Sequence, residues 1–222
     1  MLDGTQGFIR KGQYCIALAL MEDDQPVLGV LGCPNLGSSL ESSSQFEGVI
    51  LVGEKDHGAF QYNISDLDSK NTLLEADAVR ISCSHNSDLA RIRTTESFEV
   101  RGFARQLNQQ ISAELKILVP SVKMDSQCKY AVVARGDSDL YLRLSSASYA
   151  ECIWDHAAGA IVVQSAGGIV TDFRGKALDF SVGRRLRQNQ GIVCSNIHIH
   201  NTVIECIRRL NPLDIFGEVS SL

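Results

Sequence analysis

A run of very small residues in the last third of the chain constrains its fold more than any other feature. Residues 157–159 read Ala-Ala-Gly, and the segment ends at the pair Gly167-Gly168. This pattern predicts a helix from Asp155 to Ala166 that the two glycines terminate. A helix face of Ala and Gly allows neighbouring backbone to approach very closely. We therefore expect this helix to pack tightly inside the fold.

Strand and helix patterns alternate along the rest of the chain, which is typical of an α/β protein. The early strands are joined by short turns, such as the one at residues 22–26, so an antiparallel sheet is expected first and mixed α/β structure after it. Apolar periodicity predicts helices over about residues 98–118, 126–134 and 202–210. Strands are predicted at residues 14–21, 27–33, 48–53, 59–62, 79–83, 117–122, 140–144, 169–171 and 192–194.

Composition excludes several classes of protein. The 222 residues are 44% hydrophobic, enough for a sizeable core, and the net charge of −5 argues against binding to a nucleic-acid backbone. No apolar run approaches the ~18–20 residues that span a bilayer, so no membrane association is expected. The seven cysteines are scattered and odd in number, which indicates reduced thiols in an intracellular protein.

Two aspartates mark the candidate chemistry. Asp155 stands at the predicted start of the small-residue helix, and Asp3 opens an Asp-Gly-Thr turn near the first residue. Each has a purely structural explanation. An Asp at a helix start caps free N–H groups, worth about 1 kcal/mol, and Asp-Gly is a common turn dipeptide. Brought together by the fold, however, two carboxylates would make a site for a hard cation such as Mg²⁺.

Both motifs resemble the signatures of the magnesium-dependent, lithium-sensitive phosphatases of the inositol monophosphatase superfamily. The resemblance rests on Asp-Gly-Thr-x-Gly-Phe at residues 3–8 and Trp-Asp-x-Ala-Ala-Gly at residues 154–159. It implies an α/β fold, a layered α+β sandwich of the inositol monophosphatase and sugar phosphatase type. It implies Mg²⁺ bound by the carboxylates of Asp3 and Asp155 and the carbonyl of Leu2. Gly4 and Thr5 would hold the phosphate through their N–H groups, the Thr5 hydroxyl would orient the attacking water, and Asp155 would also face the substrate.

A second set of residues is similar to the branch of this superfamily that cleaves nucleoside bisphosphates. Asp-Ser-Gln-x-Lys-Tyr at residues 125–130 and Tyr-Leu-Arg at residues 141–143 occur in that branch, the 3′(2′),5′-bisphosphate nucleotidases. The resemblance implies that Ser126, Lys129 and Arg143 bind the nucleotide. It implies a phosphomonoesterase that removes the 3′-phosphate of 3′-phosphoadenosine 5′-phosphate to give AMP. Residues 97–103 lack the His that this branch carries there.

The start of the chain adds a further expectation. The first motif of the family reads Asp-Pro-Ile-Asp-Gly-Thr, whereas this chain begins Met-Leu-Asp-Gly-Thr. We therefore expect residues 1–80 to be the remainder of a metal-binding lobe, residues 81–222 to form the nucleotide-binding lobe, and activity to be impaired. Asp125 or Glu151 would have to complete the metal site if the chain were active. A catalytically dead nucleotide-binding remnant and an inositol phosphate phosphatase are the alternatives. The complete protein is expected to be a monomer in the cytoplasm, a mitochondrion or a plastid.

Overall fold

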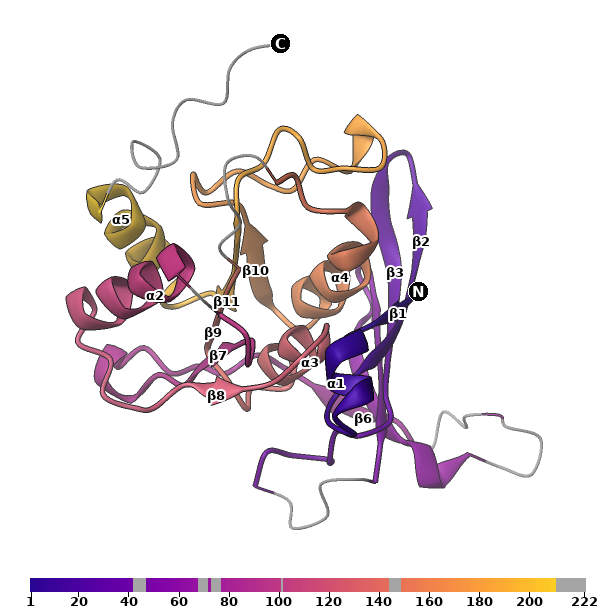
Figure 1. The fold of residues 1–222 in the computed structure, drawn as a ribbon. Coiled ribbons are helices and arrows are strands. Elements are labelled where there is room, and N and C mark those ends of the chain that lie inside the picture. Colours follow the sequence, from indigo (N-terminus) through magenta and orange to yellow (C-terminus); the bar gives the residue numbers. More distant parts are fainter. Residues whose placement is uncertain (42–46, 68–71, 73–76, 101, 144–148, 211–222) are drawn as a thin grey trace.

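Two β-sheets and two pairs of helices alternate in layers in the computed structural model of the protein (Figure 1). The structure describes residues 1–41, 47–67, 72, 77–100, 102–143 and 149–210. One sheet forms a face of the molecule, two helices follow it, and the second sheet and the second helix pair complete the stack. This arrangement confirms the α/β class and the division into an antiparallel and a mixed sheet.

The first sheet is antiparallel throughout and follows chain order from β1 to β6. Its hairpin turns contain residues at positive φ, Asp23 and Asp24 between β2 and β3 and Asp56 between β4 and β5. These short polar turns join β2 to β3 and β4 to β5 as hairpins. The strands are β1 (Leu2–Asp3), β2 (Cys15–Glu22), β3 (Gln25–Cys33), β4 (Val49–Glu54), β5 (Gly58–Asn63) and β6 (Val79–Ile81).

The second sheet has the order β10-β11-β9-β7-β8 and is mixed. Its strand β7 pairs in parallel with both β8 and β9, whereas β9, β11 and β10 are antiparallel neighbours. The strands are β7 (Thr94–Glu96), β8 (Val122–Lys123), β9 (Leu140–Arg143), β10 (Gly168–Thr171) and β11 (Ile192–Asn196). The expected strand over residues 117–122 is therefore wrong except at its last residue.

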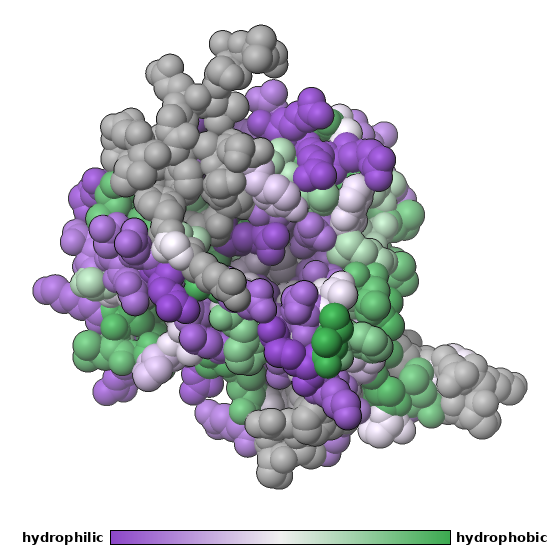
Figure 2. Space-filling model, in the orientation of Figure 1, coloured by the Kyte–Doolittle hydropathy of each residue, from purple (hydrophilic) through white to green (hydrophobic). Residues whose placement is uncertain are grey.

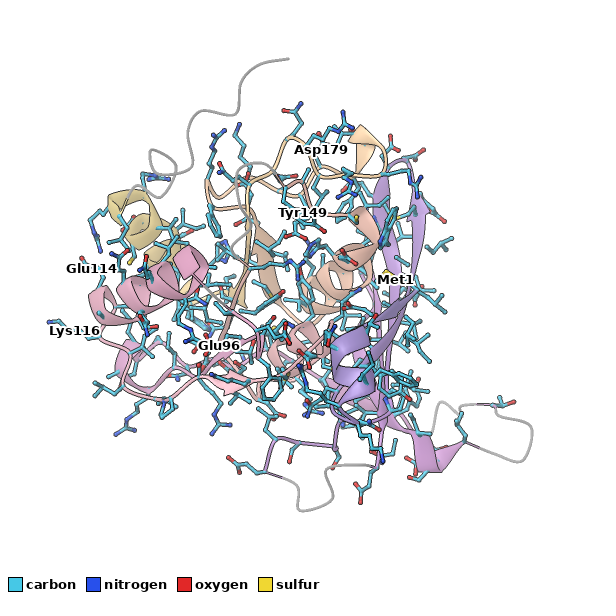
Figure 3. All side chains as sticks on the ribbon, viewed as in Figure 1. Met1, Glu96, Glu114, Lys116, Tyr149 and Asp179 are labelled. Carbon is cyan, nitrogen blue, oxygen red and sulfur yellow. The ribbon has the colours of Figure 1, made fainter. Side chains whose placement is uncertain are left out.

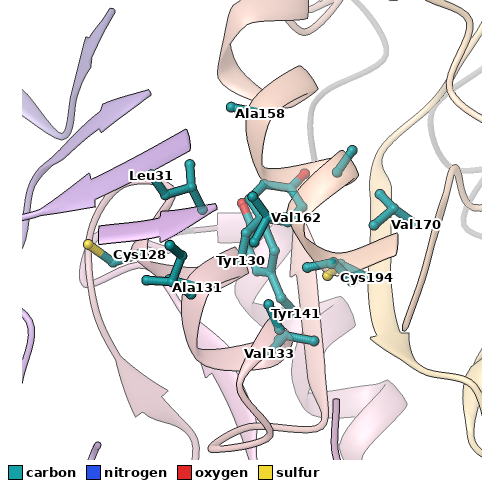
Figure 4. Close-up of a cluster of buried hydrophobic side chains, with 14 of the residues drawn as sticks. Leu31, Cys128, Tyr130, Ala131, Val133, Tyr141, Ala158, Val162, Val170 and Cys194 are labelled. Atoms are coloured by element: carbon teal, nitrogen blue, oxygen red, sulfur yellow. The ribbon is translucent and has the colours of Figure 1, made fainter. Parts of the chain in front are cut away.

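The helices fill the space beside and between the sheets. Helices α3 (Cys128–Ala134) and α4 (Ala157–Ser165) lie between the two sheets, while α2 (Gly102–Glu114) and α5 (His200–Leu210) cover the far face of the second sheet (Figure 1). The short helix α1 (Thr5–Ile9) sits at the edge of this stack, directly after β1. Tyr130 from α3, Tyr141 from β9 and Val162 from α4 meet in the main core (Figure 4).

Helix α4 packs as closely as its composition predicts. A Cβ added to Gly29 of β3 would lie 2.5 Å from the carbonyl oxygen of Ala158, and one on Gly53 of β4 would lie 2.5 Å from Cα of Val162. On the other side of the helix, a Cβ on Gly159 would lie 2.4 Å from the ring of Tyr130. Glycine at these positions lets α4 touch the first sheet and α3 at once, so its N-terminus is held firmly.

The position of that N-terminus differs from the prediction. Residues Ile153–Asp155 form a 3₁₀ turn, and α4 begins only at Ala157, with His156 in the capping position. Asp155 therefore lies before the helix instead of inside its first turn. The β1 strand and α1, which carry the Asp-Gly-Thr motif, were not expected from periodicity because both are too short to show one. The proposed boundary between residues 80 and 81 stays a prediction.

The surface is apolar along part of the first sheet. Ile16, Leu18 and Leu20 alternate on the outer face of β2 and are 46%, 59% and 52% exposed. Figure 2 shows hydrophobic residues gathered on the side of the molecule where β1 and β2 lie. Among the described residues, no helix is long and apolar enough to cross a membrane.

Candidate active site

A pocket of about 380 Å³ lies where the first turn of the chain meets the segments before α3 and α4. Six of the eight residues expected from sequence line it. They are Leu2, Asp3, Gly4, Thr5, Ser126 and Asp155. Lys129 and Arg143 are not among the lining residues. The fold thus brings the two Asp motifs and the Ser126 segment to one place, although the Asp3 motif is more than 100 residues from the other two in the chain.

Two glycines shape the first motif for this contact. Gly4 has a φ of 91°, a left-handed conformation that glycine adopts readily, and it turns the chain from β1 into α1. A Cβ on Gly4 would lie 2.7 Å from Cβ of Ser126. A Cβ on Gly7 would lie 1.9 Å from the carbonyl oxygen of Gln13 and 2.9 Å from Asp125. The Asp-Gly-Thr-x-Gly spacing therefore allows the turn to pack on residues 125–126.

Asp155 does not cap α4. No side chain caps that helix through a hydrogen bond, and its capping position is occupied by His156. Within the described part of the chain, the Asp155 carboxylate has no hydrogen bond and no ion pair. Burial raises its pKa, the His156 ring opposes this, and the negative charge of Asp3 raises it further. The structure therefore gives no support to the capping explanation.

Asp3 is also without a partner for its carboxylate among the described residues. Two carboxylates that line one pocket and repel each other are a suitable donor set for a divalent cation. Mg²⁺ is usually held by one or two carboxylates together with water and substrate phosphate. Asp3, Asp155 and the carbonyl of Leu2 fit that requirement in part. No group of three or more His, Cys, Asp or Glu side chains suited to a metal occurs in the described residues.

The two other carboxylates considered from sequence are already neutralised. Asp125 forms an ion pair with Arg10, which also pairs with Glu99 at 3.0 Å. Glu151 accepts a hydrogen bond from Nε of Arg143 at 2.8 Å, and its Oε2 lies 3.3 Å from Nε2 of His156. Burial alone would raise the pKa of Glu151, but these two partners outweigh it and lower the pKa to about 2.

The expected nucleotide-binding set is split by the fold. Ser126 lines the pocket, whereas Lys129 is buried, with only 2% of its surface exposed, and its Nζ donates to the carbonyl oxygen of Met124 at 3.3 Å. Burial, and then the positive charge of Arg143, lower the pKa of Lys129 to about 8, although Asp3 and Asp125 act against this. Lys129 and Arg143 therefore lie outside the pocket lining, and their role in binding stays a prediction.

A hydrogen-bonded network that sequence reasoning missed supports the Asp155 segment. The hydroxyl of Tyr130 lies 2.8 Å from Nδ1 of His156, which in turn reaches Glu151. Gln127 donates through Nε2 to the carbonyl oxygen of Trp154 at 3.0 Å and accepts from the N–H of Gly159 at 3.0 Å. Gln127 and Tyr130 belong to the Ser-Gln-x-Lys-Tyr motif. Their spacing of three residues, which places them on one helix face, was the available signal.

Comparison with known sequences assigns the chain to a family. The sequence profile described as "Inositol monophosphatase family" matches residues 2–211. The chain belongs to the inositol monophosphatase family. The sequence resemblance of the Asp-Gly-Thr and Trp-Asp-x-Ala-Ala-Gly motifs is thereby confirmed at the level of the family.

Curated relatives within this family include enzymes named 3′(2′),5′-bisphosphate nucleotidase. One from Dictyostelium discoideum is 50% identical over 208 residues, which is 94% of this chain and 60% of the relative. Another from Schizosaccharomyces pombe is 39% identical over 215 residues, which is 96% of this chain and 59% of the relative. The chain thus spans about 60% of the length of these relatives.

Solved structures of the family share the fold. An inositol monophosphatase from Anabaena superposes with a TM-score of 0.65 at 21% identity, covering 96% of this chain and 71% of that one. A Thermotoga maritima protein titled IMPase gives a TM-score of 0.67 at 23% identity, covering 97% and 68%. At this level of identity the likeness concerns the fold alone.

Proposed function

We propose that this chain carries part of the active site of a magnesium-dependent phosphomonoesterase that removes the 3′-phosphate of 3′-phosphoadenosine 5′-phosphate and yields AMP. One observation supports this most. Asp3 and Asp155, which are far apart in the sequence, line a single pocket, and neither carboxylate has a partner among the described residues. The names of the Dictyostelium and Schizosaccharomyces relatives support the same substrate.

Each pocket residue has a distinct part in the proposed reaction. Asp3, Asp155 and the carbonyl of Leu2 would hold Mg²⁺, which supplies neutralisation of the phosphate charge and a lower pKa for water. The N–H groups of Gly4 and Thr5 lie at the start of α1, where helix geometry leaves them without an intrahelical acceptor, so they can donate to a phosphate oxygen. Thr5 lines the same pocket, and its hydroxyl would orient the attacking water for in-line displacement.

The nucleotide would be held by charge on the far side of the pocket. Ser126 lines the pocket, and the positive charges of Lys129 and Arg143 would favour a second, non-reacting phosphate. Because Lys129 is buried and its pKa is lowered to about 8, its charge is costly in the free protein. An anionic nucleotide would offset that cost. This is the reason for preferring a bisphosphate to a substrate with a single phosphate.

We further propose that the 222 residues alone are poorly active. Two carboxylates and a carbonyl oxygen leave most of the near-octahedral coordination of Mg²⁺ to water. Asp125 lines the pocket but is paired with Arg10, and Glu151 is paired with Arg143. Removing one electrostatic group from a catalytic site typically costs ~10²–10³ in rate. We therefore expect phosphate release by this chain to be at least ~1000-fold slower than by the Dictyostelium relative.

The test compares substrates and proteins in parallel. Phosphate release from 3′-phosphoadenosine 5′-phosphate and from inositol 1-phosphate is measured in Mg²⁺ for this chain, its Asp155→Asn variant and the Dictyostelium relative. The proposal expects slow release from the nucleotide, inhibition by lithium, and no release by the variant. Faster turnover of inositol 1-phosphate than of the nucleotide would contradict the proposed substrate. Turnover by Asp155→Asn equal to that of the unaltered chain would contradict the proposed role of Asp155 in the site.

A further inference from the structure

A polar helix face outside the candidate active site borders a cavity beside the second sheet. Arg105, Asn108, Gln109 and Ser112 follow one another at helical spacing along α2, and they border a cavity of about 420 Å³ above β7, β8 and β9. Apolar side chains usually fill such a helix–sheet contact. In Figure 3, Glu96 of β7 lies near α2 and marks this region.

This cavity lies on the opposite side of the second sheet from the candidate active site. Successive side chains of a strand point to opposite faces. In β9, Tyr141 packs in the core between the sheets with Tyr130, whereas Leu140 and Leu142 pack with the residues of α2 and α5 and border the cavity. The cavity and the Asp155 pocket share no lining residue. They are therefore separate sites.

Polar groups of Asn108 and Arg105, like the Thr95 hydroxyl, lack the partners that such groups normally have. The Oδ1 atom of Asn108 is buried and has no hydrogen-bond partner. The guanidinium of Arg105 donates from Nε to the carbonyl oxygen of Val100 at 3.1 Å, and no described carboxylate pairs with it. A buried acceptor without a donor is destabilising. Within the described part of the chain, the cavity thus offers an unused acceptor and an unused cation.

The other residues that line the cavity indicate which kind of ligand it could bind. Glu96 is satisfied by the hydroxyl of Ser121 at 2.8 Å and lies 4.0 Å from Nζ of Lys123, so it does not neutralise Arg105. Apolar side chains of Ile111 and Leu142 provide a surface for a ring or hydrocarbon group. A cavity of this size is within the range of small-molecule sites.

We propose that this cavity is a second, non-catalytic binding site for a small organic anion that carries both an acidic group and a hydrogen-bond donor. The acidic group pairs with Arg105, the donor satisfies Oδ1 of Asn108, and the apolar part rests on Leu142. Adenosine 5′-monophosphate has all three features and serves as the probe. The proposal does not depend on the activity proposed for the Asp155 pocket.

The experiment measures AMP binding to the 222-residue chain by calorimetry, with EDTA present. Arg105→Gln is expected to weaken AMP binding at least tenfold, because a hydrogen bond to a charged group is lost. Arg91→Gln, which removes an exposed charge elsewhere, serves as the matched control and should leave binding unchanged. No binding to the unaltered chain, or binding that Asp155→Asn abolishes and Arg105→Gln does not, would overturn the proposal.

A second variant separates binding from folding. Asn108→Leu removes the unpaired acceptor and places an apolar side chain beside Ile111, so the free protein should melt at a higher temperature while AMP binding weakens. Inorganic phosphate, which lacks the donor and the apolar group, should bind more weakly than AMP. A lower melting temperature for Asn108→Leu would show that Oδ1 has a structural partner, and the assignment would be wrong.

Discussion

Replacing Gly29 by Ala tests the close packing that holds the Asp155 segment. The added Cβ would lie 2.5 Å from the carbonyl oxygen of Ala158 and 2.5 Å from a methyl carbon of Ile161, so either α4 or β3 must shift. Overpacking of this kind costs about 1–3 kcal/mol, and removing a strand glycine returns about 0.5–1 kcal/mol. We expect a net loss of about 1–2 kcal/mol, seen as a melting temperature lower by about 2–8 °C.

The same strand supplies a matched control for Gly29→Ala. A Cβ on Gly32 would meet nothing closer than 3.7 Å, so Gly32→Ala should leave the melting temperature unchanged or raise it slightly. Thermal unfolding followed by circular dichroism gives both values under identical conditions. If the two variants melted together, α4 would not be in contact with β3 as described. The reasoning about small residues in this helix would then fail.

Three further outcomes follow from charges and ion pairs. Because burial lowers the pKa of Lys129 to about 8, the unfolded chain binds more protons between that pH and the ordinary lysine pKa of about 10.5, so stability should rise across this window. Lys129→Met should remove that rise from the dependence of the melting temperature on pH. Glu151→Gln should lower the free energy of unfolding by about 2 kcal/mol, measured by urea denaturation. The loss is smaller than for a fully buried ion pair because the Arg143 side chain is 36% exposed. An unchanged urea midpoint would contradict the ion pair between Glu151 and Arg143. Lys129→Met should also weaken binding of 3′-phosphoadenosine 5′-phosphate more than binding of AMP, and equal losses would place its charge elsewhere.

Periodicity was sufficient to predict the long strands and helices of this fold. The apolar alternation over β2 to β5 predicted the antiparallel first sheet, and the small residues of α4 predicted a closely packed helix. The structure confirms both predictions. The predicted strand at residues 117–122 failed because an apolar run of that length does not distinguish a strand from a connecting segment. The start of α4 was misplaced by two residues because helix boundaries depend on capping geometry, which here involves His156 and not Asp155.

The candidate site was predictable in its residues and not in its electrostatics. Asp3, Ser126 and Asp155 do meet at one pocket, as motif resemblance indicated. No pattern could show that Lys129 is buried, or that Glu151 is neutralised by Arg143 and His156, because these depend on which tertiary neighbours each group acquires. Ion pairing and burial are properties of the packed chain. Ion pairing and burial determine which carboxylates remain without a partner and could therefore bind a cation.

Magnesium binding by the two aspartates is the most direct test of the central claim. Trp154 is the single Trp of the chain and precedes Asp155, so its fluorescence can follow titration with Mg²⁺. Asp3→Asn and Asp155→Asn should each weaken Mg²⁺ binding at least tenfold, and the double variant should be little worse than either, because both act on one ion. Without Mg²⁺, neither variant should melt at a lower temperature, since each relieves repulsion between the carboxylates. Unchanged affinity in either single variant, or strictly additive losses, would show that Asp3 and Asp155 do not share a cation.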